Sequence, residues 1–200
     1  MAERSLHWLP LAIALSVAPL GACGGGNGAI RPTSQFTAEH AESFEDGIDF
    51  YADPELLEGR WREDWTRDIQ KRVGWSDLIA IVSVSTLRTD IDPERRTTFR
   101  IVAKIDRVIL GEAPADDELV LPVREGQPGF VSVEGHDQRI LNHQFVLYTK
   151  WYLNEIDEIA PHWHLSPATP AIVRRTEYLA ARRDEAVAEQ PRRTVVEHEN

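Results

Sequence analysis

The chain has a single cysteine, Cys23, among its 200 residues, and this scarcity limits how the fold can be stabilised. One thiol cannot form a disulfide within the chain, so stability must come from a packed core and from polar contacts. The apolar run Leu9–Leu20 has only 12 residues and contains Pro10 and Pro19. A membrane-spanning helix needs roughly 20 apolar residues, so this run is too short to remain as a membrane anchor.

Sequence motifs of nucleophilic and phosphate chemistry are also missing. None of the serines at 83, 85, 132 and 166 lies in a Gly-x-Ser-x-Gly elbow. The glycines of 24–28 follow no strand and open no helix, so they do not form a phosphate-binding loop. The carboxylates of Asp116–Glu118 adjoin a turn, where solvated acids are common. A hydrolase would therefore have to be of an unrecognised type.

Negative charge dominates the chain, which has 33 acidic residues, 22 Lys and Arg, and a formal net charge of −11. Such a protein is repelled by nucleic acid and by anionic lipid headgroups, so we expect no nucleic-acid partner. Between Glu39 and Gly59 there is no Lys or Arg, and aromatic and aliphatic residues alternate with acids. A calcium site would need the Asp-x-Asp-x-Asp-Gly loop pattern, which is absent. We expect a solvated acidic segment whose aromatic side chains dock on the domain.

Residues Leu20-Gly21-Ala22-Cys23 follow the apolar run and a short polar start that contains Arg4. This order resembles the signal of a bacterial lipoprotein, in which the cysteine is lipidated and becomes the mature N-terminus. The resemblance implies that residues 1–22 are a signal peptide and that acyl chains, palmitate among them, hold Cys23 on the membrane. An ordinary cleaved signal, or a buried segment with a chance cysteine, is the alternative. By analogy with Gram-negative sorting, Gly24 favours the outer membrane over the inner membrane of the cell envelope.

Composition then divides the rest of the chain into three parts. Residues 23–52 are expected to be the lipidated cysteine and a flexible acidic linker, because the glycines of 24–28 cannot pack a core. Residues 53–189 are expected to form one globular domain. Residues 190–200 are charged and are expected to be a disordered tail.

Asp53-Pro54 is typical of a helix start, with aspartate as the cap and proline in the first turn. Apolar residues then recur every fourth position and predict an amphipathic helix that ends near Gly74; they are Leu57, Trp61, Trp65, Ile69 and Val73. We interpret the two tryptophans as core anchors rather than as a ligand platform. A second helix is predicted over Ala171–Glu189, after Thr169-Pro170.

The centre of the chain is rich in Ile, Val and Thr, which favours strands. Strands are predicted over Asp77–Leu87, Thr97–Leu110, Glu118–Val123, Gln144–Leu153 and His162–Ser166, with a further one around Phe130–Val133. Helices do not alternate with these strands. The fold class is therefore expected to be mainly β with flanking helices (α+β), built on a small antiparallel barrel or sandwich.

Five stretches of this central region resemble secreted bacterial domains with an OB-like barrel, distantly similar to netrin-like and metalloprotease-inhibitor domains. They are Ser76–Val82, Thr98–Ile101, Ile105–Glu112, Glu118–Val123 and Phe145–Tyr148. The resemblance covers residues 76–165 and implies an OB-like barrel of uncertain function. Asn142–Phe145 departs from the family pattern, and a lipidated chain lacks the free N-terminal cysteine of the inhibitors. Protease inhibition is therefore not implied.

His162-Trp163-His164 is the most suggestive local pattern for a metal site. On a strand, residues i and i+2 face the same side, so the two imidazoles would lie together. Zinc or copper needs at least one further ligand, for which the candidates are His136, His143, Glu155, Asp157 and Glu158. The alternative is a pair of solvated histidines around a buried Trp163.

The sequence therefore predicts an anchored, non-enzymatic binding module with no cofactor, whose partner is an envelope protein or a small ligand. Trp151-Tyr152 could supply an exposed aromatic to such a ligand, although core packing is the preferred interpretation. A metal-binding protein that uses His162 and His164 is the first alternative, and a hydrolase is the second.

Overall fold

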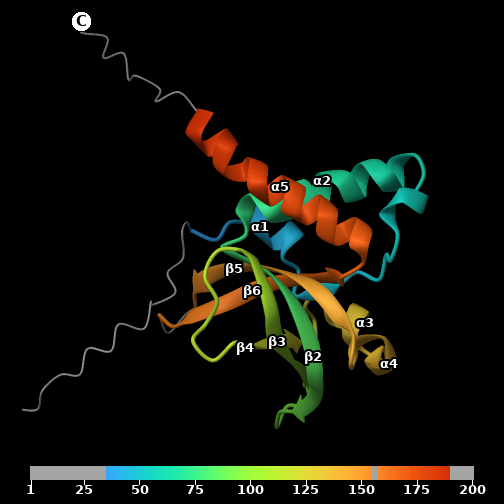
Figure 1. Cartoon of the computed structure of the whole chain (residues 1–200). Coiled ribbons are helices and arrows are strands. Elements are labelled where there is room, and N and C mark those ends of the chain that lie inside the picture. Colours follow the sequence, from blue (N-terminus) through green and yellow to red (C-terminus); the bar gives the residue numbers. More distant parts are fainter. Residues whose placement is uncertain (1–34, 155–156, 190–200) are drawn as a thin grey trace, which may run out of the picture.

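Figure 1 shows the computed structural model of the chain, which describes residues 35–154 and 157–189. A curled sheet carries helices on its two sides, with α1, α2 and α5 together on one of them. The elements in chain order are α1 (Ala38–Ser43), β1 (Gly47–Ile48), the 3-10 turn η1 (Pro54–Leu56), α2 (Arg60–Trp75), β2 (Leu78–Ile91), β3 (Thr97–Leu110), β4 (Glu118–Arg124), α3 (Phe130–Val133), α4 (Asp137–Ile140), β5 (Gln144–Leu153), β6 (Ile159–Pro167) and α5 (Pro170–Glu189).

The six strands form one sheet in the order β1-β6-β5-β2-β3-β4. All neighbours are antiparallel except β1, which pairs in parallel with β6. The block β5-β2-β3-β4 has the strand order of a Greek key, with α3 and α4 in the long connection between β4 and β5. The expected class, mainly β with flanking helices, is confirmed.

The curl of the sheet brings β6 toward β4, at the other end of the Greek key. Trp163 Nε1 on β6 donates to the Pro122 carbonyl of β4 across 3.4 Å. Among the described residues no backbone ladder joins these two strands. The sheet is therefore a half-barrel. In a closed barrel β4 and β6 would pair through their backbones, and here the large Trp163 side chain fills the gap between them.

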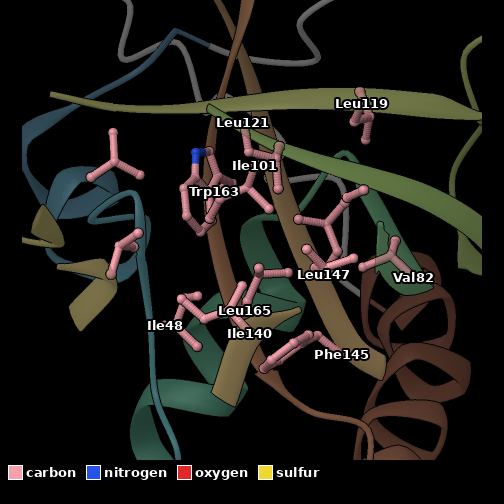
Figure 2. Close-up of a cluster of buried hydrophobic side chains, with 14 of the residues drawn as sticks. Ile48, Val82, Ile101, Leu119, Leu121, Ile140, Phe145, Leu147, Trp163 and Leu165 are labelled. Atoms are coloured by element: carbon pink, nitrogen blue, oxygen red, sulfur yellow. The ribbon is translucent and has the colours of Figure 1, made fainter. Parts of the chain in front are cut away.

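Alternation along the strands gives the sheet two apolar faces. The concave face holds the larger core, with Trp163 and Leu165 of β6 against Leu147 and Phe145 of β5 (Figure 2). The opposite face packs Ile79, Val146 and Tyr148 against α2 and α5. Tyr148 is fully buried there, and its hydroxyl lies 2.7 Å from Thr176 Oγ1 of α5.

Two sequence expectations are corrected by these elements. Asp53 does cap a turn, by accepting from the Glu55 N–H, but that turn is η1, and α2 begins only at Arg60 after Gly59 takes a φ of 53°. Phe130–Val133 is helical, not a strand, because its two apolar ends, spaced three residues apart, both face the core. The five other predicted strands are confirmed within a few residues.

The linker expected over residues 23–52 does not extend to its predicted end. α1 and β1 lie within that range, and β1 is a strand of the sheet. Phe44 and Ile48 are buried with 1% and 4% of their surface exposed, so they belong to the two cores. The acidic segment is thus an integral part of the domain.

Two glycines allow this segment to cross the start of α3. A Cβ on Gly129 would lie 2.2 Å from the Asp46 carbonyl oxygen, and one on Gly47 would lie 2.8 Å from Gly129 Cα. The Gly129 N–H donates to the Glu45 carbonyl across 3.0 Å. This close approach fixes the backbone on which Asp46 and Asp49 are carried.

A buried ion pair holds the start of β2 to β5. Lys150 Nζ lies 3.0 Å from Asp77 Oδ1, and both side chains are only 2% exposed. Asp77 Oδ2 also accepts from the Trp151 N–H across 2.9 Å. Removing one partner of such a pair is more costly than replacing both, because the remaining charge stays buried.

Lys150→Met should therefore lower the free energy of unfolding by about 3–5 kcal/mol, since it removes the cation paired with a buried carboxylate. Adding Asp77→Asn should recover part of that loss, because the neutral amide oxygen can still accept from Trp151 N–H. Urea denaturation of the two variants and the parent chain measures both effects. A double variant that is less stable than Lys150→Met would contradict this account of the pair.

Candidate functional site

His162 and His164 lie on the same face of β6, as their spacing predicted, and this face is turned toward the helices. Each imidazole meets its own carboxylate from the acidic segment. His162 Nδ1 lies 2.9 Å from Asp46 Oδ2, and His164 Nε2 lies 3.0 Å from Asp49 Oδ2. The parallel pairing of β1 with β6 sets these contacts, because it places residues 46–49 beside 162–166.

Both carboxylate oxygens of Asp46 are occupied. Its second carboxylate oxygen accepts from the Trp163 N–H across 3.0 Å, and Gln127 Nε2 donates to Oδ2 across 3.2 Å. His162 stacks on both Phe36 and Tyr152, with ring centroids 4.2 and 4.3 Å away, and these two rings also contact one another at 5.6 Å. These contacts make His162 a structural link between the acidic segment and β6.

Asp49 lies at the centre of a deeper cluster under α2. Ser166 Oγ donates to Asp49 Oδ2 across 2.6 Å, and the Arg72 guanidinium of α2 lies 3.7 Å from the same oxygen. Arg72 Nε also donates to the Ser43 carbonyl across 3.1 Å. His164 and Arg72 are 1% and 8% exposed, so the charges of this cluster lie largely out of water.

Burial acts on the two titrating groups of the cluster in opposite senses. It would raise the pKa of Asp49, but the hydrogen bonds from His164 and Ser166 and the nearby guanidinium outweigh it, so this pKa lies below its ordinary value. Burial, aided by the Arg72 charge, lowers the pKa of His164 despite the Asp49 carboxylate. At neutral pH the pair is an ionised Asp49 and a neutral imidazole.

The tautomer of His164 follows from this charge state. An ionised carboxylate only accepts hydrogen bonds, so the proton of the neutral ring must be on Nε2, which faces Asp49. Nδ1 is then a hydrogen-bond acceptor. It is buried and has no hydrogen-bond partner among the described residues, and Glu45 Oε1 lies 3.7 Å from it.

His164, Asp49 and Arg72 form part of the wall of a cleft of about 340 Å³ between the acidic segment and α2. We call this space the acidic cleft. Its carboxylates outnumber its guanidinium groups by three. The acidic lining residues are Glu42, Glu45, Asp49, Asp64 and Asp68, and the basic ones are Arg67 and Arg72.

Aromatic side chains form the outer part of the acidic cleft. Trp61 is 68% exposed and Tyr51 is 46% exposed, while Trp65 is half-buried deeper in the wall. The expectation that both tryptophans anchor the core is wrong for Trp61. Only the C-terminal half of α2 is buried, at Ile69, Arg72 and Val73, and Trp61 lies in the exposed first turn of the helix. An acidic cavity edged by indole and phenol rings suits cationic ligands.

A second hollow of about 430 Å³ lies between η1, α2 and α5 and shares Trp65 with the acidic cleft. Trp65 Nε1 is buried without a hydrogen-bond partner in the described part of the chain. Arg62 and Arg175 line this hollow, and Arg62 donates to the Glu55 carbonyl. It contains no buried titratable group, so the acidic cleft is the stronger candidate site.

The metal prediction for His162 and His164 stays a prediction. Within residues 35–154 and 157–189, no three His, Cys, Asp or Glu side chains are placed to hold one ion. Of the proposed further ligands, His143 instead has Nε2 3.2 Å from the Gln138 carbonyl, and Glu155 lies outside the described residues. The sequence pattern found both histidines but not their carboxylate partners.

The serines are placed for structural contacts. Ser166 and His164 both bind Asp49, whereas a nucleophilic serine would donate to the histidine. Ser132 Oγ donates to the Gly129 carbonyl, and Ser83 Oγ donates to Asp106. Trp151 is buried in the concave core, and its neighbour Tyr152 stacks on His162, so neither is a free ligand platform.

The predicted signal peptide (1–22), Cys23 and the tail (190–200) lie outside the described residues. Among the helices that are described, none has the length and apolarity to cross a bilayer. Comparisons with protein-family models, with curated proteins and with solved structures gave no match to the chain.

The lowered pKa of His164 predicts a stability that falls with acid. The unfolded chain binds a proton near pH 6.5 and the folded chain only at lower pH, so this contribution is present above pH 6.5 and is lost as pH falls below it. His40, whose pKa is also lowered by burial and by Lys150, adds to the same slope. Asp49, whose pKa is lowered from 3.8, contributes stability that is present above pH 3.8 and is lost only as pH falls below it.

Urea denaturation at about pH 7.5 and about pH 5 should therefore show a loss of stability that is smaller in His164→Gln than in the parent chain. The variant is expected to be less stable at the higher pH, since it loses the contact with Asp49. An equal pH-dependent loss in both proteins would mean that His164 titrates normally.

The burial difference along α2 gives a second prediction. Trp61→Ala should change the free energy of unfolding by no more than about 0.5 kcal/mol, because the side chain is exposed. Ile69→Ala, two turns later and 2% exposed, should cost about 2–5 kcal/mol. Thermal and urea denaturation compare the two, and a large loss for Trp61→Ala would place that side chain in the core.

Proposed function

We propose that this protein is a lipid-anchored protein of the bacterial cell envelope whose domain binds a ligand or partner without catalysing a reaction. The observation that carries the proposal is the acidic cleft, which combines exposed aromatic rings with buried polar groups. Ligand sites are concave and carry fixed polar groups that orient the ligand, and this cleft combines such groups with aromatic rings.

The architecture supports a binding role for the β domain. We propose that β2–β6 form an OB-like barrel, a partly open five-stranded Greek-key barrel. The strand order and the contact between Trp163 and Pro122 are consistent with such a barrel. The family resemblance of residues 76–165 points the same way. Domains of this architecture commonly present one face or one set of loops to a ligand.

The anchor is proposed from the sequence of residues 9–23. Two or more acyl chains on Cys23 would hold the domain stably on a bilayer, where a single chain would not. The acidic surface makes attraction of the folded domain to anionic headgroups unfavourable. In this proposal the lipid fixes the location, with the outer membrane favoured, and the domain faces its ligand in solution or its envelope partner.

Crosslinking in cells, followed by purification and mass spectrometry, tests the proposal. The full-length chain should incorporate a palmitate analogue, fractionate with the envelope and capture a partner in near-stoichiometric amount, unless the ligand is small. Cys23→Ser is the matched control and should lose the label and the membrane fraction.

Retention of the label in Cys23→Ser would overturn the proposed anchor. Turnover of a broad ester, peptide and glycoside panel by the purified chain, abolished by Ser166→Ala, would overturn the non-enzymatic role. A metal that copurifies and is lost in His164→Ala would instead favour the alternative of a metal-binding protein.

A further inference from the structure

The wall of the acidic cleft contains two hydrogen-bond acceptors that face one another. His164 Nδ1 lies 3.7 Å from Glu45 Oε1, is buried, and has no hydrogen-bond partner among the described residues. A lone pair and a carboxylate oxygen repel one another at this distance. A buried acceptor without a partner also costs free energy. A donor with two N–H groups would remove both costs by donating to the two acceptors at once.

The cations that already line the acidic cleft do not supply that donor. Arg67 is paired with Asp64 across 2.8 Å and with Asp68 across 3.5 Å. Arg72 is bonded to the Ser43 carbonyl and lies beside Asp49. In the described part of the chain, neither Glu42 nor Glu45 has a Lys or Arg within ion-pair distance.

The outer part of the same cleft suits an apolar or cationic body. Trp61 presents an indole ring with 68% of its surface exposed. An indole face attracts cations and covers aliphatic groups. The volume of about 340 Å³ lies within the range of small-molecule sites.

We propose that the acidic cleft binds a small organic cation that carries a primary ammonium or guanidinium group on an apolar body. The N–H groups donate to His164 Nδ1 and to Glu45, Glu42 adds negative charge, and the apolar body covers Trp61. This inference rests on the proposed binding function and names the class of ligand.

Isothermal titration calorimetry with three related probes tests which feature of the ligand is recognised. The probes are cyclohexylmethylamine, its N,N,N-trimethyl analogue and the neutral cyclohexylmethanol, each titrated into the full-length chain in nonionic detergent and into detergent alone. The amine should bind with a Kd of about 1 mM or tighter. The trimethyl analogue keeps the charge but has no N–H, so it should bind at least about tenfold more weakly. The alcohol should bind more weakly still.

Three variants locate the site. Glu45→Gln, at a side chain 38% exposed, should weaken amine binding at least about tenfold without unfolding the chain. Trp61→Ala should weaken it roughly three- to tenfold. Glu63→Gln removes an exposed carboxylate of α2 outside the cleft and is the matched control, with unchanged affinity expected. These variants leave the buried His164 unchanged, so a loss of affinity cannot be attributed to unfolding caused by a substitution in the core.

Several results would overturn this inference. Equal affinity for the amine and its trimethyl analogue would show that N–H donation is not recognised, and an unchanged Kd in Glu45→Gln would place the amine elsewhere. Absence of amine binding up to about 10 mM would reject the ligand class. That last result would leave the anchored binding role intact if crosslinking captured a partner that Cys23→Ser loses, so the two proposals fail separately.

Discussion

The ionised Asp49 carboxylate is the contact on which the arrangement of this molecule depends. One oxygen accepts from His164 and Ser166 of β6 and lies beside Arg72 of α2. Three separate elements, β6, α2 and the segment after β1, therefore meet at one buried charge. Because that charge is expensive to bury without its partners, the contact ties the positions of the three elements to one another. Asp49, Arg72 and His164 also line the acidic cleft, so the same contact shapes its wall.

The parts of the fold that are set by local chemistry were predictable from the sequence. The residues rich in Ile, Val and Thr predicted strands β2 to β6, and Thr169-Pro170 predicted the start of α5. The shared face of His162 and His164 followed from the geometry of a strand. Two expectations about single elements were wrong. The apolar row of α2 continues into a first turn that the core does not cover, so Trp61 is exposed. The apolar residues of Phe130–Val133 suit a short helix as well as a strand, and the segment is helical.

The candidate site could not be predicted, because its partners are distant in the chain. Asp46 and Asp49 lie more than 110 residues before the histidines that they contact. The strand that brings them together, β1, has two residues and no strand pattern of its own. Close contact between Gly47 and Gly129 guides the segment into place, and such a contact has no periodic signature. The acidic segment, which the sequence predicts to be a solvated linker, is in this way folded into the wall of the acidic cleft.

The contact between Trp163 and Pro122 also affects whether copies of the chain can pair with one another through their sheets. Since β4 is the last strand of the sheet, its outer side is a potential template for pairing with another copy. Pro122 stands in the middle of this strand and supplies no N–H, and its carbonyl is already occupied by the indole of Trp163. If the proposed lipid anchor holds the chain on a membrane, copies would meet there at high local concentration in two dimensions. The same proline and tryptophan that shape the half-barrel would then also protect it against aggregation.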